Sequence, residues 1–373
     1  METRDQFQGI RIVRLSGSPK EMGRQHGKVL QKEIAFITSH LRQIIADHEG
    51  KLAGWLSPYF LPPLTSRLIK RIPSRYIEEM KGIAEGAGVK YSSILLLNVI
   101  EEVREMYYRL IGRFVQPFLC SCFVSRDEAG RIIWGRTLEY WLGEKILPSL
   151  TTVFVYHPDE NDGYPFVAIG WPGIISGLTA ISRELALVLL ASPTKGVNWR
   201  GIPEEILTRH IIQHSSSLLK AKALLTPDKV ILGQNVVLVA EGGAAVVELS
   251  SQRKQIRWLF NESSLIVTNH FQTLGREDEQ PDLYSRPGRT SLPLDFFTRQ
   301  DSHRRAAQLK TFCAVRPMTI ERAKRALQLV ANAGTVQAVI GCPSTGELWI
   351  AENKLPPVTN GEWLEYNTND WLR

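Results

Sequence analysis

The chain has 373 residues, of which 43% are hydrophobic and 22% are charged, and its formal net charge is +7. This composition is typical of a globular protein with a sizeable core and excludes a disordered or fibrous chain. The length fits two average domains or one large α/β domain with a helical extension. The basic residues are scattered and no nucleic-acid-binding motif accompanies them, so we expect no nucleic-acid partner.

The sequence also bears on location. The first residues, METRDQFQGIRIVRL, contain no apolar signal-peptide core, and no run of about 18 apolar residues occurs. We therefore expect a cytoplasmic protein without a membrane span. The basic stretch over 67–75 is interpreted as a solvated helix face, with contact at a membrane surface as the alternative. Four cysteines lack metal-ligand spacing and should remain thiols in a reducing compartment: Cys120, Cys122, Cys313 and Cys342.

The first third of the chain is predicted to be mainly helical, after a short strand over 10–15. Ser18 has the features of an N-cap, with Pro19 at the first helical position and Glu21 completing a capping box, and this helix is expected to run towards Asp47. Further apolar-periodic segments are predicted to form helices that end near residue 72 and that cover 74–86 and 91–104.

From Cys120 onward the pattern changes to short β-rich segments, beginning with a hairpin over 120–125 and 132–134. Strands and helix pairs then alternate in groups, which predicts an α+β fold with two antiparallel sheets covered by helices. Further strands are predicted at 152–156, 166–169, 177–181, 186–191, 235–240, 244–249, 256–259, 265–268, 336–340 and 348–351, and helices at 203–214, 217–224, 303–312 and 320–329.

Several catalytic motifs are absent from the sequence. It contains no HExxH, no CxxC pair, no Walker loop and no Gly-x-Ser-x-Gly elbow, which disfavours a metal or nucleotide enzyme and a serine hydrolase of that type. The glycine-rich stretch over 82–88 follows no phosphate-binding spacing, and its helical context suits a turn better. We therefore expect neither a metal nor an organic cofactor.

The hairpin that begins at Cys120 carries the most informative residues. A strand, a turn and a second strand bring Arg136 back beside Cys120, with Glu139 close behind. A cation beside a thiol lowers its pKa, and a carboxylate near an amine holds that amine. If Cys120 became a chain terminus, its α-amine would be a base within reach of its thiol. A buried structural cysteine at the start of a strand is the alternative.

These residues, with several motifs elsewhere, resemble a known family. Cys120 followed by Gly130, Gly135, Arg136 and an acidic residue at Glu139 is similar to the start of mature choloylglycine hydrolases and acid ceramidases. The N-terminal third resembles the isopenicillin N acyltransferase family of N-terminal-nucleophile hydrolases more closely, and this resemblance spans nearly the whole chain. Segments similar to that family occur at 17–27 (GSPKEMGRQHG), 79–89 (EMKGIAEGAGV), 94–98 (ILLLN), 268–271 (TNHF), 301–305 (DSHRR) and 334–337 (GTVQ).

The resemblance implies a four-layer αββα fold and autocatalytic cleavage between Leu119 and Cys120. Residues 1–119 would then form a helical N-terminal segment that stays a partner of the catalytic domain, residues 120–373. It also implies that Cys120 is nucleophile and base, that Arg136 holds the terminus or substrate, and that Glu139 orients the α-amine. Two further roles follow: Asn269 matches the oxyanion-hole amide, worth roughly 3 kcal/mol, and Arg304 matches a supporting arginine, with Arg305 as the alternative.

Each of these residues has a structural alternative. Arg136 could only pair with Glu139, Asn269 could cap a loop, and Arg304 could lie at a helix start without a role. Cys122 is interpreted as a wall of the pocket, and the histidines as structural or surface residues. Three aromatic residues could line an acyl pocket or belong to the core: Trp141, Phe166 and Trp171.

The chain also departs from the family at several positions. Leu119 stands where the acyltransferases commonly have glycine, Thr137 where the bile-salt and ceramide enzymes have asparagine, and Glu139 where they have aspartate. Ala191 or Ser192 stands near the position of an oxyanion asparagine. These departures leave the substrate class and the efficiency of cleavage open.

The predicted function is that of a self-processing cysteine amidohydrolase or acyltransferase, which acts on a linear amide of a small N-acylated molecule through an acyl-thioester. The main alternative is a family member without catalysis that serves as a binding or scaffold protein. A third is an unrelated hydrolase that uses Cys120 with a histidine. Neither the acyl group, the amine nor the oligomeric state is predicted.

Overall fold

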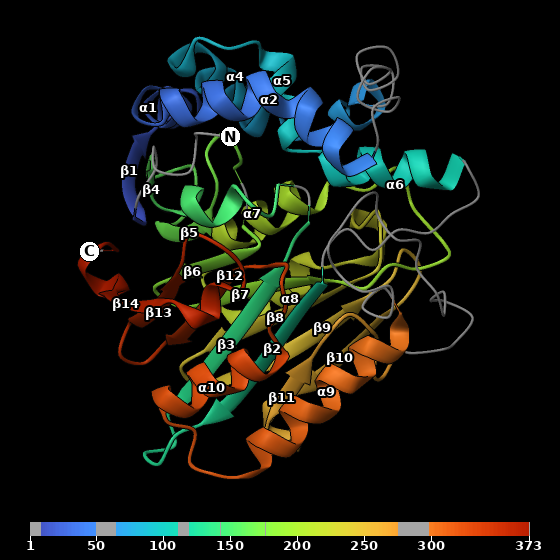
Figure 1. Ribbon diagram of the computed structural model, residues 1–373, viewed down its shortest axis with the longest axis vertical. Helices are drawn as coiled ribbons and strands as arrows, with labels where there is room; N and C mark the ends of the chain where they lie inside the picture. Colours follow the sequence, from blue (N-terminus) through green and yellow to red (C-terminus); the bar gives the residue numbers. More distant parts are fainter. Residues whose placement is uncertain are drawn as a thin grey trace.

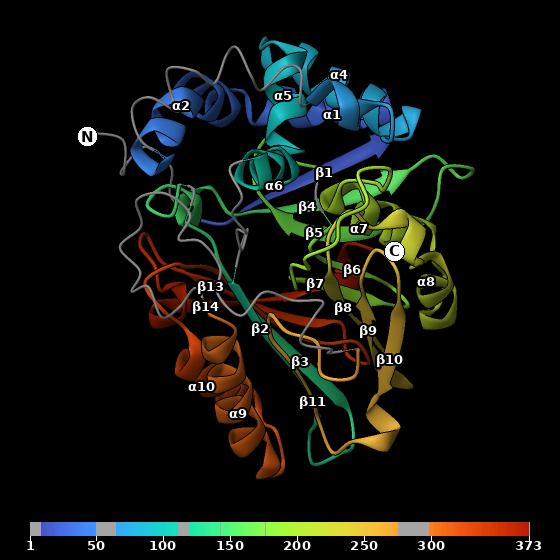
Figure 2. The ribbon, with the colours of Figure 1, turned by 90° about the vertical axis from the view of Figure 1, so that its right-hand side faces the viewer.

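Two β-sheets form the centre of the molecule (Figures 1 and 2). The computed structural model describes residues 9–49, 65–110, 119–141, 143–175, 177–274 and 298–372. The eight-stranded sheet has, in spatial order, β1 (Arg11–Gly17), β4 (Thr152–Pro158), β5 (Phe166–Gly170), β6 (Thr179–Ser182), β7 (Ala186–Ala191), β8 (Gln234–Ala240), β9 (Gly243–Leu249) and β10 (Lys254–Trp258). Its strands are antiparallel except for β1, which pairs in parallel with β4.

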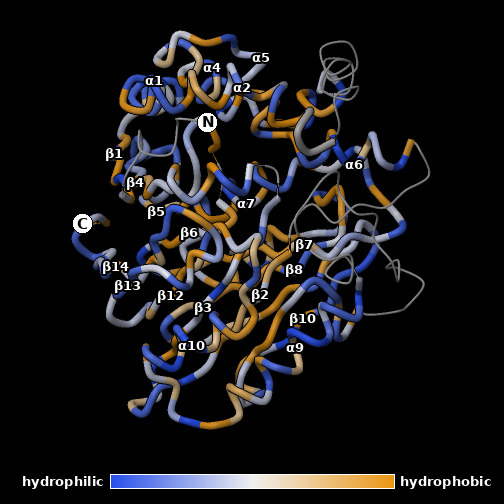
Figure 3. Tube along the Cα trace, viewed as in Figure 1, coloured by the Kyte–Doolittle hydropathy of each residue, from blue (hydrophilic) through white to orange (hydrophobic). Residues whose placement is uncertain are grey.

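The six-stranded sheet is antiparallel throughout and carries the predicted hairpin. Its spatial order is β11 (Leu265–Val267), β2 (Leu119–Arg126), β3 (Ile132–Glu139), β12 (Thr335–Cys342), β13 (Glu347–Glu352) and β14 (Glu362–Asn367). It packs face to face on the eight-stranded sheet, with β2 against β7 and β3 against β8. The strands are the most hydrophobic parts of the trace because most of them are covered on both faces (Figure 3).

Helices cover the outer face of each sheet, which completes the predicted αββα order of layers (Figure 2). Helices α7 (Glu204–His214) and α8 (Leu218–Leu224) lie on the eight-stranded sheet, and α9 (Arg299–Ala314) and α10 (Ile320–Val330) lie on the six-stranded sheet. One apolar cluster fills the space between the sheets and a second lies under α9 and α10. The predicted α+β class and layer order are therefore confirmed.

The N-terminal segment forms a helical layer at one end of the sandwich (Figures 1 and 2). It contains α1 (Pro19–Val29), α2 (Gln31–Glu49), α4 (Ser74–Ala87), α5 (Tyr91–Leu97) and α6 (Ile100–Leu110). Its first strand, β1, belongs to the eight-stranded sheet, so residues before the predicted cleavage point complete the sheet of the catalytic part. No helix among the described residues is long and apolar enough to span a membrane.

The glycines of the family-like segments bring α1 and α4 into direct backbone contact. A Cβ atom added at Gly23 would lie 2.0 Å from the carbonyl oxygen of Glu79, and one at Gly82 would lie 2.2 Å from that of Lys20. The glycine-rich stretch over 82–88 is therefore part of a helix crossing. It ends at Gly88, whose φ of 69° is the left-handed conformation that favours glycine at a helix end.

A buried ion pair anchors α4 to α7. Arg209 donates a 3.0 Å hydrogen bond to Glu79, and both side chains are almost completely buried. The guanidinium of Arg209 lies 3.9 Å from the ring centre of Tyr156 and 4.3 Å from that of Phe166. Phe166, one of the three aromatic residues considered for an acyl pocket, is therefore a core residue that holds this anchor.

Most predicted elements are confirmed, with three differences. The first helix begins after Ser18, whose hydroxyl accepts from the N–H of Glu21 at 3.4 Å, but it ends at Val29 and a second helix carries on to Glu49. The helix predicted over 91–104 is likewise two helices. The last strand, Glu362–Asn367, was not predicted, because it is a partly exposed edge strand without an apolar run.

Candidate functional site

The β2–β3 hairpin places Cys120 and Arg136 next to each other. Arg136 on β3 is the cross-strand partner of Cys122 on β2. Cys120 lies two residues before Cys122 on the same strand, so both cysteines and the arginine face the same side of the sheet. The guanidinium of Arg136 donates from Nη2 to Cys120 Sγ at 3.4 Å. The sequence-predicted contact between these two residues is therefore present in the uncut chain.

Cys120 points into the space between the two sheets. It belongs, with Cys122, to the apolar cluster between the sheets, whereas Phe123 belongs to the cluster under α9 and α10. The side chain of Cys120 has no exposed surface. Burial raises the pKa of its thiol to about 12, and the opposing effect of Arg136 is smaller. In the uncut chain the thiol is therefore neutral near neutral pH.

Asn269 binds the backbone of Cys120. Its Oδ1 accepts a 2.9 Å hydrogen bond from the N–H of Cys120, and its Nδ2 donates to the carbonyl oxygen of Ala191 at 2.8 Å. Asn235, on β8, fixes the loop around it by donating to the carbonyls of Thr268 at 3.0 Å and His270 at 3.1 Å. The amide predicted to be an oxyanion donor thus holds the Cys120 N–H in the uncut chain, and its own N–H faces Ala191.

Arg305, rather than Arg304, lies in the site. From α9 it donates to the carbonyl oxygen of Cys120 at 2.6 Å, to Ser121 Oγ at 2.8 Å and to Asn269 Oδ1 at 2.9 Å. Asp301 accepts from its Nε at 2.7 Å. The side chain of Arg304 is 51% exposed and pairs with the other oxygen of Asp301. The structure thus corrects the first choice of the sequence analysis and supports its alternative.

The helical pattern of the sequence indicates that Arg305, and not Arg304, faces the interior. Leu309 and Cys313 follow it at intervals of four residues and are buried on the same face of α9. Arg304 has no such apolar continuation, because Gln308 and Phe312 follow it and are only partly buried. Asp301 stands in the segment that resembles the family but was given no role, and it is the carboxylate that orients Arg305.

Glu139 is buried beside the predicted cleavage point. It is the cross-strand partner of Leu119, and its Oε1 accepts a 3.1 Å hydrogen bond from the hydroxyl of Thr335. Burial raises its pKa to about 7, although Arg305 and the hydroxyls of Thr137 and Thr335 lower it. The Cys120 N–H donates to Asn269 and not to Glu139. Glu139 acts on Cys120 through its charge, which raises the pKa of the thiol.

Leu119 is buried as the first residue of β2, with 2% of its surface exposed. The bond between Leu119 and Cys120 therefore lies inside a strand whose two sides are held by β3 and by Asn269 and Arg305. Trp141 and Trp171, the other aromatic candidates for an acyl pocket, are also buried in the interior. Trp171 donates from Nε1 to the carbonyl of Leu147 at 3.0 Å.

The histidines make contacts that hold helices and loops. His26 is completely buried and accepts a 2.9 Å hydrogen bond from the N–H of Gly173. Nδ1 of His270 lies 2.8 Å from Ser302 Oγ, which ties the loop after β11 to α9. Among the described residues, no three histidine, cysteine or acidic side chains are grouped as metal ligands.

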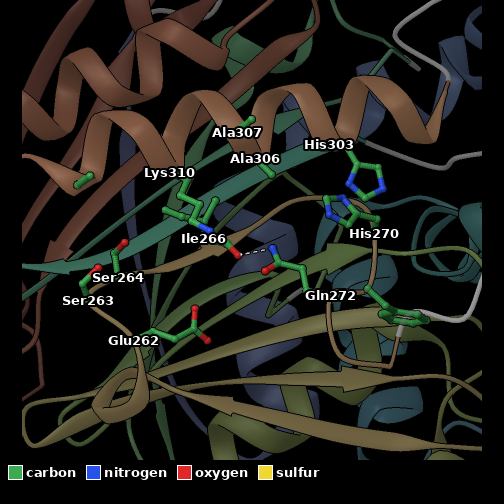
Figure 4. Close-up of a pocket in the computed structure, with 12 residues that line it drawn as sticks. Glu262, Ser263, Ser264, Ile266, His270, Gln272, His303, Ala306, Ala307 and Lys310 are labelled. Carbon is green, nitrogen blue, oxygen red and sulfur yellow. Dashed lines mark hydrogen bonds between the residues drawn. The ribbon is translucent and has the colours of Figure 1, made fainter.

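A cavity of about 690 Å³ lies between α9 and the segment from Glu262 to Gln272 (Figure 4). Its lining includes Ile266, which belongs to the apolar cluster under α9 and α10, and the polar residues His270, His303 and Lys310. Cys120 is not among its lining residues, because the thiol points to the opposite face of the six-stranded sheet.

A family model described as acyl-coenzyme A:6-aminopenicillanic acid acyl-transferase matches residues 148–300. Over these residues the chain is similar to this acyl-transferase family. The matched residues contain Asn269, whereas Cys120 precedes them and Arg305 follows them.

Two curated relatives and one solved structure extend this comparison. An uncharacterized protein of Archaeoglobus fulgidus is 26% identical over 67% of this chain and 45% of its own length. The acid ceramidase of Rattus norvegicus is 22% identical over 50% of each chain. The chain thus spans about half the length of the curated relatives that it matches. The Caenorhabditis elegans ortholog of N-acylethanolamine-hydrolyzing acid amidase has 15% identity and a TM-score of 0.45, over 68% of this chain and 97% of that chain.

Proposed function

We propose that this chain belongs to the acyl-transferase family that its residues 148–300 resemble, and that it is a self-processing cysteine amidohydrolase or acyltransferase with Cys120 as its nucleophile. One observation carries the proposal: Arg136 lies 3.4 Å from Cys120 Sγ, while Asn269 and Arg305 bind the N–H and the carbonyl oxygen of the same residue. Such fixation of a thiol and its own backbone is what a nucleophile at a chain terminus needs.

The first proposed reaction is self-cleavage. Cys120 Sγ attacks the carbonyl carbon of Leu119, so that a carbon–sulfur bond forms, the peptide carbon–nitrogen bond breaks and the thiol proton passes to the departing amine. Water then breaks the thioester. Its hydroxyl stays on Leu119 as a carboxylic acid and its hydrogen returns to the thiol. The products are residues 1–119 and a catalytic chain, residues 120–373, with a free α-amine.

Cleavage would also open the site. Leu119 and Cys120 are both buried in the uncut chain, so a substrate has no access to the thiol. Once Leu119 is released from β2, the Cys120 amine would keep Asn269 Oδ1 as its hydrogen-bond acceptor. Solvent and Arg136 would then both favour the thiolate. Glu139, the partner of Leu119 in the register, would lose this partner when Leu119 leaves β2.

The second proposed reaction is turnover of a linear amide. The α-amine of Cys120 takes the thiol proton, the thiolate attacks the amide carbonyl, and the amine passes the proton to the leaving nitrogen. Water then hydrolyses the acyl-thioester, or an amine or thiol acceptor takes the acyl group. Because both outcomes pass through the same thioester, the proposal covers a hydrolase and an acyltransferase that act on small N-acylated molecules. Since all four cysteines are unpaired, we propose a reducing compartment such as the cytoplasm.

The thioester provides the experiment. Cleaved protein is incubated with a panel of N-acyl amides, quenched in acid, and the mass of the larger fragment is measured. An increase equal to the acyl group, located on Cys120 and removed by hydroxylamine, supports the proposal. Cys122→Ala is the matched control and should keep the adduct, whereas Cys120→Ala should lose it. An adduct that is absent throughout the panel from a cleaved protein would contradict the proposed turnover.

A further inference from the structure

We infer that Thr179 and Gln337 are positioning residues that hold the guanidinium of Arg136 against the Cys120 thiol. The inference rests on the proposed function and adds two residues to it. Thr179 was not singled out in the sequence, and Gln337 appeared only within a segment that resembles the family. They lie on opposite sheets, Thr179 on β6 and Gln337 on β12, so the fold brings them together across the interior.

The three side chains form a closed hydrogen-bonded group. Arg136 donates from Nη1 to Thr179 Oγ1 and, at 3.3 Å, to Gln337 Oε1. The hydroxyl of Thr179 donates to the same Gln337 oxygen at 2.9 Å. Gln337 Nε2 donates to the carbonyl of Ile169 at 3.4 Å, which fixes which end of the amide faces Arg136. With Nη1 held in this way, Nη2 is left to face Cys120 Sγ at 3.4 Å.

The acceptors around Arg136 are all neutral. In addition to Thr179 and Gln337, the carbonyl oxygen of Leu189 accepts from Nη2 at 3.5 Å. Arg136 is completely buried and forms no salt bridge with any residue in the part of the chain that the structure describes. The charge of Arg136 also acts on Cys122 and Glu139, but among its direct hydrogen-bond acceptors only the Cys120 sulfur can become an anion.

A positioning role for Thr179 and Gln337 predicts a different result from a merely structural role, in which the two residues only satisfy buried polar groups. If Thr179 and Gln337 only satisfied each other, a substitution that keeps an acceptor at position 337 would leave the thiol unchanged. If they position Arg136, Gln337→Glu should weaken the thiolate, because a carboxylate at Arg136 would neutralise its charge. Thr179→Val should weaken it too, since the isosteric side chain lacks the hydroxyl.

The test is the pH dependence with which iodoacetamide alkylates Cys120 in the cleaved protein, located by peptide mass spectrometry. We expect Thr179→Val and Gln337→Glu each to raise the pH midpoint by about one unit, which slows alkylation below the midpoint about tenfold. Thr208→Val is the matched control, because Thr208 is equally buried and its hydroxyl bonds to the carbonyl of Glu204 at 2.9 Å, away from Cys120. It should keep the wild-type midpoint.

The possible results separate this inference from the proposed function. A wild-type chain that is uncut would overturn the proposed function. A cut and reactive wild type, with unchanged midpoints in Thr179→Val and Gln337→Glu, would overturn the inference alone. If Thr179→Val fails to cleave, Thr179→Ser, which restores the hydroxyl, is expected to cleave and to show the wild-type midpoint. Failure of Thr179→Ser, with Thr208→Val intact, would also overturn the inference.

Discussion

The backbone N–H of Cys120 donates a 2.9 Å hydrogen bond to Oδ1 of Asn269, while the Nδ2 of Asn269 is bound to the carbonyl of Ala191. The oxygen, and not the nitrogen, of this amide thus faces the predicted cleavage point. In the proposed self-cleavage, Asn269 would therefore hold the amide that is to be cleaved. Arg305 supports this orientation by donating to the same oxygen at 2.9 Å.

This relationship predicts an order among Asn269 variants. Asn269→Asp keeps an acceptor for Cys120 and Arg305, and it should slow self-cleavage by less than about tenfold. Asn269→Leu removes both ends of the amide, and it should slow cleavage by about a hundredfold or more. The measurement is the appearance of the two fragments over time on denaturing gels. An equally severe loss in both variants would identify the Nδ2 donor as the essential group and contradict the holding role.

The two neighbouring arginines of α9 offer a matched pair. Arg305→Lys should slow self-cleavage by about tenfold or more, because an ammonium cannot reproduce the planar fork that reaches the Cys120 carbonyl, Ser121 and Asn269. Arg304→Lys should stay within about twofold of the wild type, since the Arg304 side chain is half-exposed and makes none of the contacts with Cys120, Ser121 or Asn269. Fragment formation is measured for both. A larger effect at Arg304 would contradict the placement of Arg305 in the site.

The contact between α6 and α7 predicts a pH dependence of stability. Glu102 Oε1 accepts a 2.8 Å hydrogen bond from the N–H of Glu204, so the two buried carboxyl groups lie close together. Burial raises the pKa of Glu102 to about 7, and burial together with Glu102 raises the pKa of Glu204 well above its usual value. The folded state therefore binds these protons more tightly than the unfolded state, and their stabilising effect is lost as the pH rises through about 7.

We therefore expect the uncut Cys120→Ala chain to lose on the order of 2 kcal/mol of unfolding free energy from this pair between about pH 5 and pH 8. Adding Glu102→Gln and Glu204→Gln should flatten that loss. Urea unfolding at both pH values gives the unfolding free energy of the two chains. The contributions of the histidines cancel in the comparison, because both chains contain them. An identical fall in stability with and without the two substitutions would contradict the assignment of this pair.

The crossing of α1 and α4 predicts a strong effect of small substitutions. Gly23→Ala and Gly82→Ala would each place a methyl group about 2 Å from a backbone oxygen of the other helix. We expect each to destabilise the chain by more than about 2 kcal/mol. Gly242→Ala is the control, since a Cβ there meets nothing within 4 Å. Thermal melting compares the three, and a control-like melting temperature for Gly23→Ala would contradict close helix contact.

Local patterns predicted much of the fold and part of the site. The offset of Arg136 from Cys120 in a hairpin, and the capping of a helix by Ser18, depend on neighbouring residues and could be read from the chain. The break at Leu30 could not, because no glycine or proline marks it. Thr179 was missed for a different reason. Its role arises only where β6 of one sheet lies over β3 of the other, and no spacing in the sequence encodes that contact.

The choice between Arg304 and Arg305 shows the same limit at one residue. Both follow Asp301 at intervals that a helix brings together, and both bind one of its oxygens. The packing of α9 on β2 turns Arg305 towards Cys120, and in the sequence only the apolar face that Leu309 and Cys313 continue indicates this choice.

Self-cleavage before Cys120 is tested by the intact mass of the purified protein beside that of its Cys120→Ala variant. We predict two fragments in the wild type, the larger beginning at Cys120, and one full-length chain in the variant. A single uncut chain in both, from protein that is folded by its melting curve, would contradict self-processing. Such a result would favour a family member that binds its partner without catalysis.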